Sequence, residues 1–214
     1  GKCCPRALKA LEKYEKNIVS INRNSTNYEV DEVLCDGRKI ALTAIEQLVK
    51  CGHSKIGYVG DCHNEMRFLG YQEALTKYRL DSDIDYIFDT VPGEEQGYKA
   101  MEYFLKQSDP PTGIYCANDI LAIGMLKCLG KRRSRYYTPS VVSSDDIAEA
   151  QFTKPMLTTV SLPKGEMVRF ALILLLDRIA GGHKTISRLE VEGTLVFRES
   201  CYPVSRANEP EYYI

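Results

Sequence analysis

Several features are scarce in this sequence of 214 residues, and each scarcity excludes a class of protein. Lys and Arg total 28 against 29 Asp and Glu, so the net charge is −1 and the chain as a whole is not built to bind nucleic acid. The longest apolar run, residues 170–176, is far shorter than the ~18 residues of a membrane span. No apolar signal-peptide region follows the first residues, so we expect a cytoplasmic protein without a membrane partner.

Metal-binding and catalytic motifs are equally sparse. The eight cysteines include no C-x-x-C pair and are too thinly spread for a disulfide scaffold, and Cys116 and Cys128 lie in apolar patterns typical of buried side chains. The three histidines show no zinc-ligand spacing, so we expect no metal. Glycine-rich phosphate loops and the G-x-S-x-G elbow are absent, so we expect no cofactor and no enzyme activity.

The sequence does contain a regular alternation of short β-branched runs with amphipathic stretches. Strands are predicted at 17–21, 30–35, 55–60, 84–88, 112–116, 140–144, 158–162, 189–191 and 194–198. Helices are predicted between Asp36 and Gly52, at 65–79, 93–107 and 119–129, and from Pro163 to Gly181. This alternation predicts βαβ units, and hence an α/β fold whose parallel sheet is covered on both faces.

Ligands of a doubly wound sheet bind beyond the carboxyl ends of its strands. The polar residues predicted there are Asp61, His63, Asn64, Arg67, Asp89, Asn118, Asp119, Asp145 and Asp146. An Arg, an Asn and an Asp together suit a ligand rich in hydroxyl groups, because they combine a planar fork of donors with strong acceptors. Each residue taken singly has a structural alternative: Asp119 as a helix N-cap, and the Asp145–Asp146 pair as caps for residues 147–152.

A series of short motifs runs in order through most of the chain. They are residues 51–60 (CGHSKIGYVG), 67–71 (RFLGY), 110–119 (PPTGIYCAND), 145–147 (DDI), 157–160 (LTTV), 175–179 (LLDRI) and 196–201 (VFRESC). Taken together they resemble the effector-binding region of the LacI/GalR family of bacterial transcription regulators.

The resemblance implies the periplasmic-binding-protein-like type I fold, with two doubly wound parallel-sheet lobes joined by crossovers near 35–36, 161–162 and 191. The C-terminal lobe would comprise 36–161 and 191–214. Residues 1–35 and 162–190 would be the remainder of an incomplete N-terminal lobe. The helix-turn-helix, the hinge and the first βα units of such a regulator are not found in this sequence.

The resemblance also implies a function: an effector-sensing domain of a DNA-binding regulator that forms a homodimer. The effector, most often a sugar, would bind between the lobes, and operator DNA would be bound by a helix-turn-helix domain outside this chain. The motif positions that touch the effector correspond to Arg67, Asn118 and Asp145. Asp61, His63 and Pro92 align with positions that vary with the ligand.

Some positions depart from the family pattern. Ser143 and Ser144 replace a Gly–aromatic pair, and Pro92 stands where many relatives carry an aromatic ring. These departures concern the identity of the ligand. The alternative interpretation is a periplasmic sugar-binding protein of a transport system, which shares the fold but should carry a signal peptide and few free thiols. An enzyme on this scaffold would need a nucleophile or an acid–base pair in the cleft.

Overall fold

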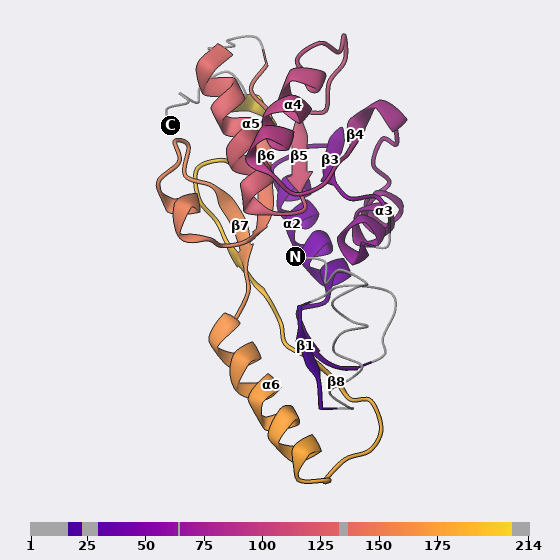
Figure 1. Ribbon diagram of the computed structural model, residues 1–214. Coiled ribbons are helices and arrows are strands. Elements are labelled where there is room, and N and C mark those ends of the chain that lie inside the picture. The colour runs from indigo at the N-terminus through magenta and orange to yellow at the C-terminus, as the bar shows by residue number, and fades with distance from the viewer. Residues whose placement is uncertain (1–16, 23–29, 64, 133–136, 207–214) are drawn as a thin grey trace. The chain divides into compact units, whose positions relative to one another are not determined.

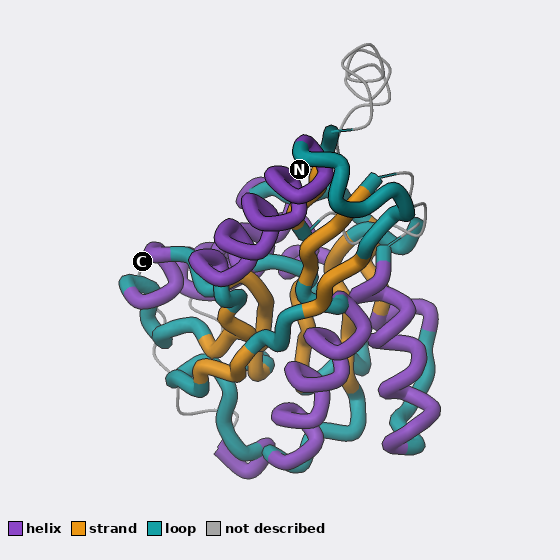
Figure 2. The backbone as a smooth tube through the Cα atoms, turned by 90° about the horizontal axis from the view of Figure 1, so that it is seen from below, coloured by secondary structure: helices purple, strands orange, loops and turns teal. Residues whose placement is uncertain are grey.

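A computed structural model describes residues 17–22, 30–63, 65–132 and 137–206 of the protein (Figure 1). The chain divides into two compact units. Unit 1 consists of Gly1–Asp36 and Pro163–Gly193, and unit 2 consists of Gly37–Leu162 and Thr194–Ile214. Helices, strands and connecting loops alternate along the chain (Figure 2). The α/β fold class predicted from the sequence is confirmed.

Unit 2 is organised around a six-stranded sheet with the order β4-β3-β5-β6-β7-β9. The strands are β3 (Ile56–Gly60), β4 (Ile87–Asp89), β5 (Gly113–Cys116), β6 (Ser140–Asp145), β7 (Thr158–Ser161) and β9 (Thr194–Val196). Pairing is parallel from β4 to β7, and β9 joins the edge antiparallel to β7. The carboxyl ends of five neighbouring parallel strands therefore meet at one edge of this sheet.

Helices cover both faces of the unit 2 sheet because successive strand residues point to opposite sides. The helices are α2 (Gly37–Lys50), α3 (Met66–Tyr78), α4 (Glu94–Phe104) and α5 (Asp119–Arg132). Tyr58 of β3 packs against Tyr115 of β5 and Tyr71 of α3, with ring centroids 6.0 Å and 5.3 Å apart. The next residue of each strand, Val59 and Cys116, belongs instead to the core formed with α4 and α5. Each face of the sheet thus has its own fully buried apolar layer.

Helix α2 shows how the local sequence specifies an element. Its buried residues Ile40, Ala41, Ala44, Ile45 and Leu48 recur at the spacing of one helix face. The helix ends before Gly52, which has a φ of +87° and donates its backbone N–H to the carbonyl of Val49 at 2.9 Å. A left-handed residue at this position is the usual end of a helix, and glycine adopts it without steric cost.

Unit 1 has a three-stranded parallel sheet and one helix among its described residues. The strands β1 (Val19–Ile21), β2 (Asp31–Leu34) and β8 (Arg188–Glu190) are arranged with β2 in the centre, and the helix is α6 (Lys164–Ile179). All of β2 is buried, but only Met167 and Ala171 of α6 are. Several apolar residues of α6 are at least half exposed, among them Leu172, Ile173, Leu176 and Ile179.

One sequence prediction needs correction. Residues 84–86, predicted as the start of a strand, form a 3-10 helix, and β4 begins only at Ile87. The Asp83 carboxylate accepts a hydrogen bond from the backbone N–H of Asp85 at 3.0 Å, and this local bond favours a turn over an extended chain. The last two predicted strands lie in different sheets, β8 beside β2 and β9 beside β7. No helix among the described residues is long and apolar enough to cross a membrane.

Candidate functional site

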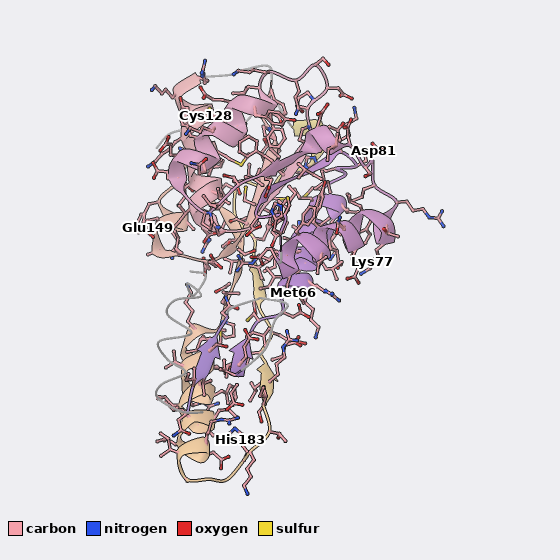
Figure 3. All side chains as sticks on the ribbon, turned by 45° about the vertical axis from the view of Figure 1, so that its right-hand side comes forward. Met66, Lys77, Asp81, Cys128, Glu149 and His183 are labelled. Atoms are coloured by element: carbon pink, nitrogen blue, oxygen red, sulfur yellow. The ribbon has the colours of Figure 1, made fainter. Side chains whose placement is uncertain are left out.

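The strongest polar arrangement of unit 2 lies at the carboxyl ends of β5 and β6 and centres on Arg67. This residue lies in the first turn of α3, which begins at Met66 (Figure 3). Its Nη1 donates to the carbonyl oxygen of Ala117 at 2.6 Å, and its Nη2 donates to Oδ1 of Asp145 at 3.2 Å. One guanidinium group therefore connects the ends of two neighbouring strands.

Arg67 is held almost entirely inside the protein, with 11% of its side chain exposed. Burial works against its charge, but the Asp145 carboxylate and nearby Tyr115 keep the pKa of Arg67 above its ordinary value. Within the described part of the chain, its Nε–H has no hydrogen-bond partner. An orphaned buried donor costs about 1–3 kcal/mol, so an acceptor atom supplied to this side chain would stabilise the site.

Asp145 occupies an unusual backbone position at the end of β6. Its φ is +114° and that of Asp146 is +47°, and neither residue is a glycine. Such conformations cost about 1–3 kcal/mol each and persist only where the surroundings hold them. The Asp146 carboxylate accepts from Arg198 Nη2 at 2.7 Å, and the backbone N–H of Ile147 donates to Asp119 at 2.8 Å. These bonds fix the loop that presents Asp145 to Arg67.

Asn118, and not Asp119, caps the N-terminus of α5. Asp119 is not the N-cap of α5, because Oδ1 of Asn118 accepts the backbone N–H of Leu121 at 3.0 Å instead. The fully buried Asp119 carboxylate accepts hydrogen bonds from the hydroxyls of Ser143 on β6 and Thr159 on β7. Burial raises the pKa of Asp119 despite these bonds. Asp119 thus ties two strands together and positions the loop after β6.

The alternative that Asp145 and Asp146 cap the short helix after β6 is wrong. That 3-10 helix, Ala148–Gln151, is preceded by Ile147, and no side chain caps it. The Asp145 carboxylate is engaged with Arg67, and the Asp146 carboxylate with Arg198. Both carboxylates serve long-range contacts rather than a local cap.

A second polar group lies at the ends of β3 and β4. Oδ1 of Asp61 accepts the backbone N–H of His63 at 2.7 Å, and Nδ1 of His63 lies 3.5 Å from Oδ2 of Asp89. The same Asp89 accepts the backbone N–H of Cys62 at 2.8 Å. Ligand atoms of the Asp61, His63 and Asp89 side chains lie within 4.8 Å of one another, close enough to share a cation. The His63 ring is exposed, and the hydrogen bonds of the two carboxylates hold this loop.

The six residues singled out in the sequence therefore fall into separate places. Arg67 contacts Asp145 directly and bonds to the carbonyl of the residue before Asn118. Asp61 and His63 form the second group with Asp89, a strand-end residue outside these six. Pro92 is exposed in the loop before α4. Asp119 and Arg198, which position the Asp145 loop, carry no local sequence signal for that role.

Comparison with known proteins gives consistent results. The sequence profile of the periplasmic binding protein-like domain matches residues 45–201. The chain is 29% identical over 185 residues to the HTH-type transcriptional repressor PurR of Haemophilus influenzae (strain PittEE), covering 83% of this chain and 54% of that protein. It is 31% identical over 192 residues to the HTH-type transcriptional repressor CytR of Escherichia coli (strain K12), covering 86% of this chain and 55% of that protein. The chain thus spans about half the length of these relatives.

The fold is also shared with solved structures. A LacI family transcriptional regulator from Enterococcus faecium, solved with bound ribose, is similar with a TM-score of 0.78 and 25% sequence identity. The match covers 94% of this chain and 76% of that structure. The type I periplasmic-binding-protein-like architecture predicted from the motifs is therefore confirmed.

Proposed function

Because this chain belongs to the family of periplasmic binding protein-like domains, in the form found in LacI-type transcription regulators, we propose that it is the effector-sensing region of such a regulator. Unit 2 would be the C-terminal lobe, and unit 1 the remainder of the N-terminal lobe. The complete protein would act in the cytoplasm as a homodimer and bind operator DNA through a helix-turn-helix domain outside this chain. It would bind its effector without chemical turnover.

The observation that carries the proposal is the contact between the buried Arg67 and the partly exposed Asp145. A guanidinium beside a partly exposed carboxylate offers donors and acceptors a few ångströms apart. Vicinal hydroxyl groups match this pattern, because each hydroxyl both donates and accepts. We infer that the effector is a small polyhydroxylated molecule, most simply a sugar, and the ribose bound to the similar E. faecium regulator supports this class.

Asn118 would complete the set of contacts to the effector. Its Oδ1 is used by the helix cap, whereas its amide nitrogen makes no protein hydrogen bond within the described residues. Asp61 and His63 would supply contacts that distinguish one sugar from another, because their loop is partly exposed at a neighbouring strand end. Pro92 offers an apolar surface without an aromatic face, so stacking of a sugar ring is not expected there.

The proposed mechanism needs no covalent step. An effector changes operator affinity only if it binds two conformations of the regulator with different affinity. Arg67 and Asp145 come from different elements, a helix start and a strand end, so their separation is sensitive to a shift of either element. Effector hydroxyls that bridge the pair would favour one conformation.

Isothermal titration calorimetry with a panel of pentoses, hexoses and nucleosides tests the proposal. We expect at least one sugar to bind, and Arg67→Ala to weaken its binding by about 10- to 150-fold, since hydrogen bonds to charged groups contribute about 1.5–3 kcal/mol. Arg67→Lys should recover only part of the loss, because an ammonium cannot reproduce the guanidinium fork. Arg169→Ala, an exposed arginine of α6, is the matched control and should bind like the unmodified chain.

Two outcomes would contradict the proposal. The first is unchanged affinity of a bound sugar in a folded Arg67→Ala variant, which would place the effector elsewhere. The second is turnover of the sugar during titration, which would indicate an enzyme. Thermal unfolding of each variant separates a lost contact from a lost fold.

A further inference from the structure

Two cysteines far apart in the sequence lie next to each other in unit 2. Cys51 follows α2 and Cys201 follows β9, 150 positions later in the chain, and their Sγ atoms are 3.6 Å apart. Both are free thiols. The effector site described above uses neither of them, so they need an explanation of their own.

The backbone around the two thiols is firmly anchored. The N–H of Val204 donates to the carbonyl of Cys51 at 3.0 Å, so the chain after Cys201 is already bonded to the end of α2. Tyr202, the residue after Cys201, is anchored as well. Its carbonyl lies 3.0 Å from Nε2 of His53, and its N–H donates to Oγ of Ser140 at 3.1 Å. A disulfide needs an S–S distance of about 2.05 Å and Cα atoms about 4.4–6.8 Å apart. The two Sγ atoms, 3.6 Å apart, need to approach by only about 1.5 Å to reach this bond length.

The two thiols differ in exposure, and this difference assigns their chemical roles. Cys51 is half-buried and its sulfur lies 3.5 Å from the amide nitrogen of Gln47, which can donate to it. Cys201 is 2% exposed, and burial together with the neighbouring Cys51 raises the pKa of its thiol. An oxidant from solvent therefore reaches Cys51 first, and Cys201 is shielded until Cys51 has reacted.

We propose that Cys51 and Cys201 form a reversible redox pair that takes a hydroperoxide as oxidant. In the first step the Cys51 sulfur attacks one oxygen of hydrogen peroxide and the O–O bond breaks; the other oxygen leaves with the thiol proton as water, and Cys51 becomes a sulfenic acid. In the second step the Cys201 sulfur attacks the Cys51 sulfur and displaces the sulfenic hydroxyl, so that the S–S bond forms. The proton of the Cys201 thiol leaves with this hydroxyl as water. Overall, two thiols and one hydrogen peroxide give one disulfide and two waters. Two equivalents of a small thiol such as glutathione reverse the reaction by exchange.

The crosslink has a defined mechanical effect. It joins the end of α2 to the segment that runs from β9 to the 3-10 helix Val204–Arg206, and so closes a loop of about 150 residues. Such a crosslink restrains the unfolded chain strongly when it fits the native geometry. Oxidation should therefore stabilise unit 2 while leaving the Arg67 site intact, because the pair lies outside that site.

The test begins with the unmodified chain, treated with hydrogen peroxide and compared with a sample kept in a thiol reductant. Remaining thiols are alkylated, and peptides are mapped by mass spectrometry without reduction. We expect the Cys51–Cys201 peptide to be the main crosslinked species. The thermal midpoint should rise by about 5–15 °C and return after reduction.

Cys51→Ser and Cys201→Ser should each abolish both the crosslink and the thermal shift. The matched control is Cys62→Ser, because Cys62 is also only half-buried but lies at the end of β3, and this variant should behave like the unmodified chain. A main crosslink through another pair of cysteines, or sulfonic acid at Cys51 without any crosslink, would overturn the proposal. Because the first readout uses the unmodified chain, poor folding of a variant does not weaken the test.

Discussion

Units 1 and 2 bury their chain in different ways. Unit 2 covers both faces of a six-stranded sheet with helices, and its fully buried side chains include Tyr58, Tyr71 and Phe104. The described part of unit 1 has three strands and one helix, α6, on which Leu172 and Leu176 remain 53% and 64% exposed. Full burial of a large apolar side chain contributes about 1.5–3 kcal/mol, so unit 2 gains far more from its core.

A polar network takes a central place in unit 1. The Asp31 carboxylate on β2 is fully buried and accepts two hydrogen bonds from Arg178 of α6, at 2.5 and 2.6 Å. It also accepts from the backbone of Ser187 at 2.7 Å and contacts Nε2 of His183 at 2.9 Å. His183 lies just beyond α6 (Figure 3), and its other ring nitrogen is 2.5 Å from Asp177. Unit 2 thus depends mainly on apolar packing, whereas charge pairing around Asp31 has a larger share in the described part of unit 1.

The largest expected effect comes from the contact between α4 and α5 in unit 2. A Cβ added at Gly124 would lie 1.9 Å from the carbonyl oxygen of Glu94, so the two helices would have to move apart. We expect Gly124→Ala to lower the free energy of unfolding of unit 2 by about 3 kcal/mol, at the upper end of typical overpacking. Urea denaturation followed by circular dichroism measures this loss.

The matched control lies in unit 1, where a Cβ at Gly165 of α6 would meet nothing within 4 Å. Gly165→Ala should stabilise the helix by about 0.5 kcal/mol, because alanine has the higher helix propensity. Equal effects of Gly124→Ala and Gly165→Ala on the free energy of unfolding would contradict the claim that the two units differ in packing.

A smaller loss is expected from breaking the polar network of unit 1. Asp31→Asn removes the charge that neutralises Arg178, and we expect unit 1 to lose about 2 kcal/mol, less than for removal of the whole side chain because the asparagine oxygen can still accept a hydrogen bond from Arg178. Asp109→Asn in unit 2 breaks an ion pair with Lys55 in which the Asp109 side chain is 68% exposed, and should cost less than about 0.5 kcal/mol. Hydrogen exchange resolved by peptide reports each unit separately.

The same network predicts that unit 1 loses stability in acid. Burial alone would raise the pKa of Asp31, but hydrogen bonds from Arg178, Ser187 and His183 lower it to about 2. A carboxyl with a depressed folded pKa stabilises the fold fully above its unfolded pKa of about 4 and loses that contribution as the pH falls toward 2. Peptides of unit 1 should lose protection over this range, and the Asp31→Asn variant should not show this transition.

The smallest expected effect is on the pH dependence of stability near neutral pH, which should have opposite signs in the two units. Hydrogen bonds to Asp177 and Asp31 raise the pKa of His183 in unit 1, whereas burial lowers the pKa of His53 in unit 2. The folded state thus binds the His183 proton more tightly than the unfolded chain, and the His53 proton less tightly. As the pH rises through about 6.5, unit 2 should gain stability, and unit 1 should lose it above that value. Hydrogen exchange at several pH values checks this, and His183→Gln should flatten the response of unit 1 alone.

Much of the fold follows from local patterns in the sequence. The periodicity of α2 and the glycine after it specify a helix and its end, and the β-branched runs mark β3, β5 and β6. The failure at residues 84–86 has a local cause, because the Asp83 side chain bonds to the backbone and replaces a strand with a turn. An apolar run alone does not reveal this competition.

Local sequence patterns predict only part of the candidate site. The strand-end rule places Arg67 and Asp145 among the polar candidates, but their contact joins residues 78 positions apart. Asn118 and Asp119 are both good caps, and only the hydroxyls of Ser143 and Thr159 explain why Asp119 turns inward and leaves the cap to Asn118. The positive φ of Asp145 had no sequence signal, since a glycine would be the usual residue there.

The amino-acid sequence specified the order of helices and strands, the buried faces and the family, because burial periodicity and turn residues act over a few neighbouring positions. Tertiary structure decided the partners of distant side chains: Asp145 for Arg67, Asp31 for Arg178 and Cys201 for Cys51. It also decided which strands pair at the sheet edges, β8 with β2 and β9 with β7. Such contacts depend on the path of the whole chain, which no local pattern encodes.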